Sequence, residues 1–242
     1  MKSVKSIMLL LLFSFAFRGF SQVAKNDFAS INKAYADQEQ LSVKVTYQVF
    51  RNKTTPVAFS TEKGEVKQKG ILRYTRTGDI ETVETETYRL IVDHEDKNIS
   101  LLDIISRENK NEEMKTVSPV ELDELIAMCS KVEFKKLNST QNCYTLVIPD
   151  EQYQEVKLIY NAKNFFIEKL ILYYSEKQNL EGKDDGLMEA PRVEITYSDF
   201  NTHPDFDQTP FSYNSFLEKR NGKLLAKAAY KAYTVNDQLS IK

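Results

Sequence analysis

Apolar and polar residues alternate strictly over residues 41–49, where every odd-numbered position is apolar and every even-numbered position is polar. Successive side chains of a β-strand point to opposite faces, so this pattern predicts a strand with one apolar and one polar face. Such a strand is half-buried, with its apolar row turned toward the interior. The apolar row of this strand consists of Leu41, Val43, Val45, Tyr47 and Val49.

Three further strand-like segments follow without a helical pattern between them, which predicts a four-stranded antiparallel meander. Their limits come from turn signals: Gly64 opens the second strand, Gly78 closes it, and a polar stretch at 93–98 precedes the fourth. A second series of strands lies later in the chain and includes a hairpin with its turn at 138–141. The predicted strands after the first are 64–76, 80–92, 97–104, 131–137, 142–148, 154–160, 164–175 and 192–198.

Helical spacing of apolar residues occurs in two segments, 25–38 and 118–130. In the first segment one apolar face carries Phe28, Ile31 and Tyr35. The second begins with Ser118 and Glu121, which fit a capping box, in which each side chain satisfies an unpaired backbone N–H of the other residue. The apolar face of this second helix carries Leu122, Leu125, Ile126 and Cys129.

Three segments have no single dominant pattern. Residues 177–190 form a polar insertion, which we interpret as a mobile hairpin loop. Residues 201–216 contain two prolines and are predicted to be irregular. Residues 222–235 fit a strand by alternation and a helix by composition, and both interpretations stay open.

The order of these elements predicts an α+β fold that is mainly antiparallel β. A sheet of nine or more strands tends to curl or close, so we expect a strongly curved sheet or an incomplete β-barrel. The N-terminal helix and the mid-chain helix then lie against the sheet, and the mid-chain helix is the natural lid over its concave face.

The first residues have the features of a secretory signal peptide. Lys2 and Lys5 form a basic start, and the apolar run at 7–17 is shorter than the roughly 20 residues that span a membrane. Small residues at Gly19 and Ser21 predict cleavage after Ser21. We therefore divide the chain into a signal peptide at 1–21 and a single domain at 22–242, with a C-terminal extension from about residue 201. The expected location is periplasmic or secreted.

The charge balance argues against polyanionic partners. The whole chain has 33 Lys and Arg against 35 Asp and Glu, and cleavage removes three basic residues and no acidic one. The mature chain then carries 30 basic and 35 acidic residues, a formal charge of −5. A mildly acidic chain without a basic block is a poor candidate for binding nucleic acid or anionic membrane surfaces. We also expect no transmembrane segment in the mature chain.

Catalytic motifs are missing from the sequence: it has no GxSxG, HExxH, CxxC or GxxxxGK[ST] pattern. His94 lies in an acidic stretch that we interpret as a solvated turn, and the residues around His203 are too few for a transition-metal site. We therefore predict no enzyme activity, no catalytic residues, no metal and no cofactor. Cys129 and Cys143 form either a disulfide, which an exported protein permits, or two buried free thiols.

The order of the elements resembles that of the LolA/LolB-like group of periplasmic lipoprotein carriers. The resemblance covers roughly residues 25–200 and rests on the signal, the helix, the alternating strand at 41–47, the mid-chain helix and the returning strands. It implies an incomplete barrel with a helical lid and an apolar cavity that holds acyl chains. The chain departs from the group in its extension past Phe200 and in the loop at 177–190.

These observations favour a soluble periplasmic carrier that binds a lipid or lipoprotein, of the non-lipidated type because no Cys lies at the cleavage site. The alternative is a non-catalytic structural or interaction protein of a bacterial envelope complex, built on the same scaffold with a filled core. The expected partners are an acyl chain and, in the alternative, an envelope protein. The predicted lipid-binding residues are Val43, Val45, Tyr47, Val49, Leu122, Leu125 and Ile126.

Overall fold

A computed structural model describes residues 24–104, 122–149, 152–182, 186–207 and 209–238. The predicted signal peptide and the predicted capping box at 118–121 lie outside the described residues. The described chain forms two compact units. Unit 1 holds residues 24–37, 51–55 and 122–193, and unit 2 holds 38–50, 56–104 and 194–238, apart from the gaps just given. The expectation of a single domain over 22–242 stays a prediction.

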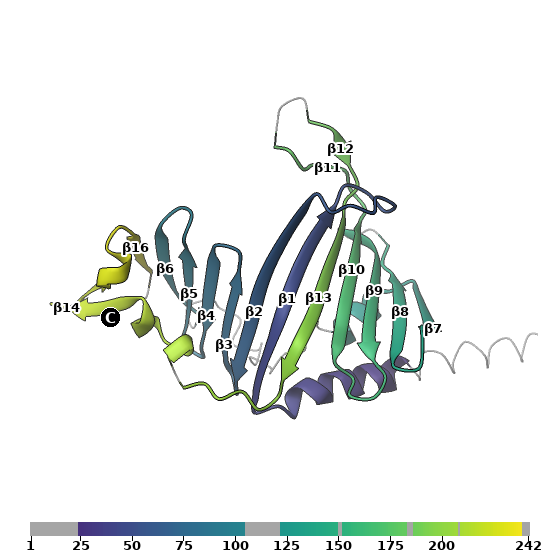
Figure 1. The fold of residues 1–242 in the computed structure, drawn as a ribbon, viewed down its shortest axis with the longest axis horizontal. Coiled ribbons are helices and arrows are strands. Elements are labelled where there is room, and N and C mark those ends of the chain that lie inside the picture. Colours follow the sequence, from purple (N-terminus) through teal and green to yellow (C-terminus); the bar gives the residue numbers. More distant parts are fainter. Residues whose placement is uncertain (1–23, 105–121, 150–151, 183–185, 208, 239–242) are drawn as a thin grey trace, which may run out of the picture. The chain divides into compact units, whose positions relative to one another are not determined.

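Unit 2 is built on an antiparallel meander of six strands that pair in chain order (Figure 1). Two strands from later in the chain flank this meander in the sheet. The last strand, β16 (Thr234–Gln238), pairs with β6 in parallel, and β13 (Arg192–Asn201) lies beside β1. The C-terminal segment therefore returns to extend the sheet. The six strands are β1 (Gln40–Phe50), β2 (Ser60–Lys69), β3 (Leu72–Thr77), β4 (Ile80–Glu84), β5 (Tyr88–Asp93) and β6 (Asn98–Asp103).

The prediction of four strands in this meander was wrong, because two short connections carry weak turn signals. Gly64 lies inside β2, and the true turn follows at Gly70, whose φ of 57° favours glycine. The next residue, Ile71, is apolar and hides this turn in the sequence pattern. The second connection contains neither Gly nor Pro. There the Thr85 hydroxyl accepts hydrogen bonds from the backbone N–H groups of Thr87 and Tyr88 at 3.3 and 3.1 Å.

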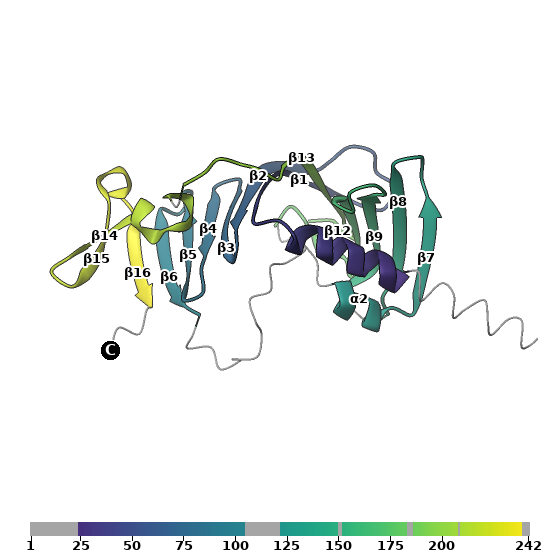
Figure 2. The same cartoon turned by 90° about the horizontal axis from the view of Figure 1, so that it is seen from below.

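The core of unit 2 lies between the meander and the C-terminal segment. That segment forms η1 (Thr209–Phe211), η2 (Tyr213–Ser215), β14 (Leu217–Arg220), β15 (Lys223–Ala226) and η3 (Ala228–Tyr230), so residues 222–235 combine strands with a short 3₁₀ turn. Figure 2 shows β14 and β15 gathered at the β16–β6 end of the unit. The buried cluster consists of Tyr74, Val83, Leu90, Val92, Ile99, Leu101, Phe211, Phe216 and Leu217.

Unit 1 contains four antiparallel strands in the order β10-β9-β8-β7, close to the predicted ranges. They are β7 (Lys131–Lys136), β8 (Gln141–Val147), β9 (Tyr153–Asn161) and β10 (Ile167–Tyr174). The polar insertion contains a small hairpin, in which β11 (Gln178–Asn179) pairs with β12 (Met188–Glu189). The mid-chain helix α2 covers Leu122–Met128 within the described residues.

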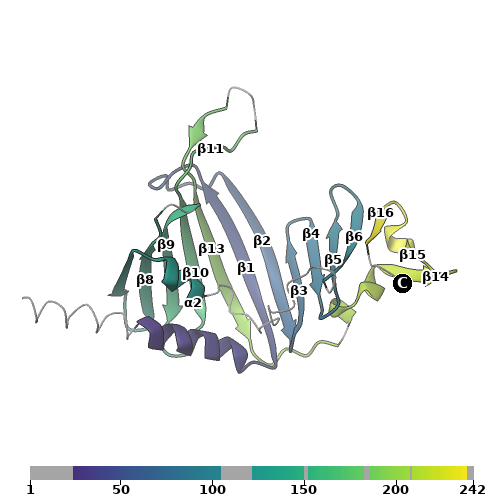
Figure 3. The ribbon, with the colours of Figure 1, turned by 180° about the vertical axis from the view of Figure 1, so that it is seen from behind.

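The N-terminal helix, residues 24–36, packs on one face of the unit 1 sheet, and Figure 3 shows it over the same face as α2. Phe28 is fully buried, and its ring meets the Tyr144 ring edge-on at 4.7 Å. Asp27 accepts hydrogen bonds from the hydroxyl groups of Tyr144 and Tyr160 at 2.7 and 2.5 Å. Burial, and then the bond to Asp27, raises the pKa of both tyrosines, so both stay protonated donors. The predicted helix and its apolar face are thus present.

These two units confirm the predicted fold class, α+β and mainly antiparallel β. In the linear strand order of the described residues, the end strands β16 and β7 each pair on one side only, so the sheet is not closed. None of the helices in the part of the chain that the structure describes is long and apolar enough to cross a membrane.

Candidate lipid-binding face

The side of β1 that carries its apolar row continues across unit 2 as one face of the sheet, with polar as well as apolar members. Residues directly opposite one another on antiparallel strands lie on the same side, so the register identifies each face. Val43 lies opposite Val66, and the row continues through Thr75. We call this side the Val45 face. Its members in the two rows closest to the β2–β3 turn are Leu41, Val43, Val66, Gln68, Arg73, Thr75, Thr82, Glu84, Arg89, Ile91, Ser100 and Leu102.

The opposite side, which we call the Tyr74 face, carries the unit's own core. Val83, Leu90 and Ile99 on this face are fully buried, and the C-terminal segment covers them. On the Val45 face, Val43 and Val45 of β1 are also buried, with 6% and 2% of their surface exposed. In the two rows just named, however, all residues from β2 to β6 except Gln68 are only half-buried. From β3 to β6 the C-terminal segment therefore covers the Tyr74 face, while the side chains of the Val45 face stay partly exposed.

A row of polar side chains crosses the Val45 face at one end. Arg73 lies opposite Glu84, and Glu84 lies opposite Arg89 on the next strand. Arg89 Nη2 contacts Glu84 Oε1 at 2.5 Å. The Nε atoms of both arginines are buried and have no hydrogen-bond partner among the described residues. The row therefore holds two guanidinium groups and one carboxylate, and that carboxylate is paired with Arg89.

A shallow cleft of about 530 Å³ lies just beyond this row, at the turns that end the strands. It is lined by residues 69–72 and 85–88 together with Glu39. This volume is in the range of small-molecule pockets. Its lining includes Glu39, Glu86 and a single cation, Lys69, so its charge does not favour an anion. The two arginines of the neighbouring row belong to the Val45 face.

The structure places the predicted site residues in both units. The alternation of burial on β1 is clear up to Val45 and then fades, because Tyr47 and Val49 are half-buried like the polar residues between them. Lys44 points to solvent with 71% of its side chain exposed and pairs with Asp199 at 2.8 Å. Leu125 and Ile126 of α2 are half-buried, and the side chain of Leu122 lies outside the described residues. That the α2 residues and the β1 row form one site stays a prediction.

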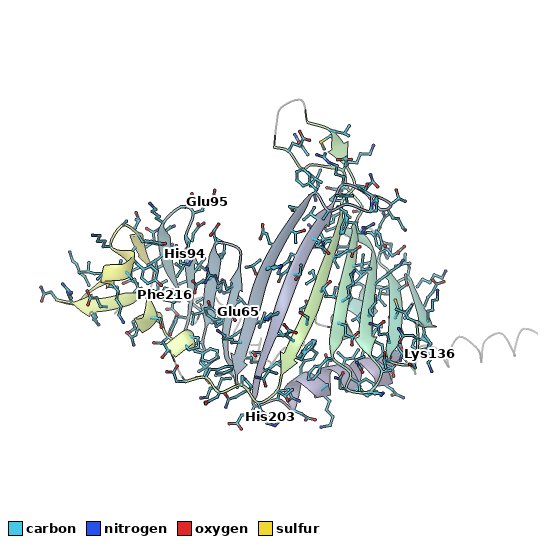
Figure 4. All side chains as sticks on the ribbon, in the orientation of Figure 1. Glu65, His94, Glu95, Lys136, His203 and Phe216 are labelled. Atoms are coloured by element: carbon cyan, nitrogen blue, oxygen red, sulfur yellow. The ribbon has the colours of Figure 1, made fainter. Side chains whose placement is uncertain are left out.

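The interpretation of His94 as a solvated turn was wrong in one respect. His94 is in the turn after β5, where Figure 4 labels it, but only 20% of its side chain is exposed. Its Nε2 lies 2.7 Å from Glu81 Oε1, and its Nδ1 lies 2.8 Å from the hydroxyl of Tyr233. Tyr74 donates a second hydrogen bond to Glu81 at 2.8 Å. The network ties the C-terminal segment to β4, so we assign it a structural role.

The sequence left open whether Cys129 and Cys143 form a disulfide or stay free. In the structure both are free thiols. Burial raises the pKa of the Cys129 and Cys143 thiols, which lowers their thiolate content at neutral pH. Neither therefore has the depressed pKa of an activated nucleophile. Among the described residues, no group of three or more His, Cys, Asp or Glu side chains is placed to hold a metal ion.

The arginine row is the part of this face that sequence reasoning missed. Arg73 lies between Leu72 and Tyr74, and Arg89 lies between Tyr88 and Leu90, so each charge interrupts an apolar run. That pattern was a signal that both arginines occupy the less buried side of their strands. It does not reveal that they flank the same glutamate, because this depends on the register of three strands.

Comparison with known proteins finds similarity only among solved structures; the chain matches no protein-family model and no curated protein. A LolA superfamily protein from Nitrosomonas europaea is 14% identical, with 79% of this chain and 98% of that chain covered and a TM-score of 0.36. A putative outer membrane lipoprotein-sorting protein domain from Vibrio parahaemolyticus is 12% identical, with the same coverages and TM-score. Lipoprotein LppX of Mycobacterium tuberculosis is 10% identical, with 77% and 99% covered and a TM-score of 0.37.

These matches confirm that the chain is similar to LolA-like structures, as the order of its elements indicated. At such identities and TM-scores the likeness carries no argument about what this chain binds.

Proposed function

We propose that the chain is a soluble carrier of the periplasm or the secreted space that holds the acyl chain of a lipid or lipoprotein on the Val45 face. One observation carries the proposal. From β3 to β6 the sheet of unit 2 has its buried core on the Tyr74 face, yet Val66, Ile91 and Leu102 give the Val45 face apolar residues that are only half-buried. An antiparallel sheet that packs on a core through one face commonly has polar side chains on its solvent-exposed face.

The chemistry of acyl binding suits this face. Each buried CH₂ group of a ligand contributes about 0.8 kcal/mol, so an acyl carrier requires apolar area and no catalytic group. Val66 supplies half-buried apolar surface next to the buried Val43, and Ile91 and Leu102 supply more at the β5–β6 end. Half-burial is also suitable for a carrier, because cargo must leave as well as enter.

The predicted location is part of the same proposal. A signal peptide at 1–21 would deliver the chain across the inner membrane, and a mature formal charge of −5 would disfavour adsorption to anionic membrane surfaces. A carrier in that space would meet acyl chains only when they leave a membrane or a lipoprotein.

The substitution Val66→Gln tests the proposal on the half-buried part of the face. We expect it to raise the Kd for a fluorescent fatty acid about tenfold, because loss of one apolar side-chain contact removes roughly 1.5 kcal/mol. Lys63→Gln is the matched control, since Lys63 is exposed on the opposite face of the same strand. Fluorescence titration measures both, with circular dichroism to show that both variants fold. Equal affinities for the two folded variants would remove the Val45 face from the proposal.

One observation favours the alternative, an interaction protein of an envelope complex. Leu41, Val43 and Val45 are no more than 6% exposed, as in a filled core. In that case the wild-type protein would bind no fatty acid in the same titration and would instead purify with a stable protein partner.

A further inference from the structure

The arginine row of the Val45 face contains two guanidinium groups and one carboxylate. Arg73 and Arg89 lie on either side of Glu84, and the ion pair between Arg89 and Glu84 occupies that carboxylate. Each guanidinium carries five N–H donors, and a single carboxylate cannot accept from both groups in full. The unpartnered, buried Nε atoms of both arginines in the described residues show the same shortage of acceptors.

Glu39, Lys69 and Glu86 lie at the turns, in the lining of the cleft, and the other charges on this face lie farther along the strands. The next row, from Val43 through Val66 to Ser100, is uncharged. Asp93 is two rows away, about 13 Å along the strand, and its carboxylate accepts from the backbone N–H of Asp96. Glu62 is one row farther still. On this face of β1–β6, an acceptor for the arginines must therefore come from outside these rows.

We propose that the acyl ligand of the Val45 face has an anionic headgroup, a phosphate or a carboxylate, and that Arg73 and Arg89 bind it. The inference rests on the proposed function and specifies its ligand. Planar guanidinium groups bind such anions through paired N–H···O bonds, which are stronger than bonds between neutral groups. An anion beside Glu84 would bring the row to electrical balance.

The same row borders the apolar residues that would receive the acyl chain. Leu41 and Gln68 continue the arginine row toward β1, and Val43 and Val66 follow in the next row. A ligand with its headgroup over Arg73 therefore meets apolar side chains within one row, about 7 Å along the strands. This order, a cationic row followed by an uncharged row with apolar side chains on β1 and β2, matches an amphiphile and not a free anion.

Calorimetric titration of the full mature chain with three probes tests the inference: decyl phosphate below its aggregation concentration, decanol and inorganic phosphate. We expect the wild type to bind decyl phosphate about tenfold more tightly than decanol. Arg73→Gln and Arg89→Gln should each remove about that factor for decyl phosphate and leave decanol binding unchanged. Arg76→Gln is the control, because Arg76 lies on the same strand as Arg73 but on the Tyr74 face.

The possible outcomes distinguish the headgroup inference from the proposed acyl binding. Equal binding of decyl phosphate and decanol by the wild type would overturn the headgroup inference and leave the proposed function standing. Absence of binding for both alkyl probes would overturn the proposed function itself. Binding of inorganic phosphate as tight as that of decyl phosphate would identify a site for the free ion and overturn the lipid headgroup. If an arginine variant fails to fold, the ratio of the wild-type affinities for decyl phosphate and decanol still tests the headgroup inference.

Discussion

Val45→Asp is expected to destabilise unit 2 by about 3–5 kcal/mol, the cost of leaving an uncompensated charge inside a protein. Only 2% of the Val45 surface is exposed, and its partner across the strand pair is Gly64, which offers no side chain to the carboxylate. The new group must therefore take up a proton, admit water or open the sheet. Urea denaturation followed by circular dichroism measures the loss.

Lys44→Gln is the matched control on the next residue of the strand. Lys44 is exposed, and the hydrogen bond from its ammonium group to Asp199 raises the pKa of Lys44. Exposed ion pairs of this kind contribute little to stability. We expect an unfolding midpoint close to that of the wild type. A similar loss of stability in both variants would mean that β1 does not have one buried and one exposed face.

Phe28→Ala is expected to destabilise unit 1 by about 3–5 kcal/mol, the usual cost of truncating a buried aromatic ring. Phe28 is fully buried, and its ring packs against Tyr144 beside the hydrogen bond from Tyr144 to Asp27. Loss of the ring removes the main apolar anchor of the N-terminal helix on the sheet. Urea unfolding monitored by tyrosine fluorescence provides the measurement.

Lys25→Ala on the same helix is the control, because Lys25 is exposed. It should leave the unfolding midpoint of unit 1 near the wild-type value. An equally small effect of Phe28→Ala would show that the helix contributes little to the stability of this unit.

Periodicity predicted the elements whose two faces differ strongly in polarity. The strand at 41–49 and the N-terminal helix each have one row of large apolar residues, and burial of that row is what holds them in place. The six-stranded meander was harder to predict, because the turn at Gly70 is followed by Ile71 and the turn at Thr85 is made by a side-chain hydroxyl. Neither turn interrupts the hydrophobic pattern enough to mark a strand end.

The candidate site depends on strand register, which a single sequence does not contain. The row from Gln68 to Arg89 becomes a row only when β2, β3, β4 and β5 pair with their observed offsets. The His94 network likewise joins residues 81, 94 and 233, which no local pattern connects. By contrast, the apolar row of β1 belongs to one strand, and its membership was readable from alternation alone.

Native mass spectrometry of the protein purified from its own exported compartment tests acyl binding most directly. We predict a mass above that of the mature chain by one acyl-bearing species, which organic extraction removes and which carries an anionic headgroup. The fraction of loaded protein should fall in the Val66→Gln variant and stay unchanged in Lys63→Gln. A mature chain that carries no extractable acyl species, although it is folded and was never exposed to detergent, would contradict the assignment of the Val45 face as a lipid-binding surface.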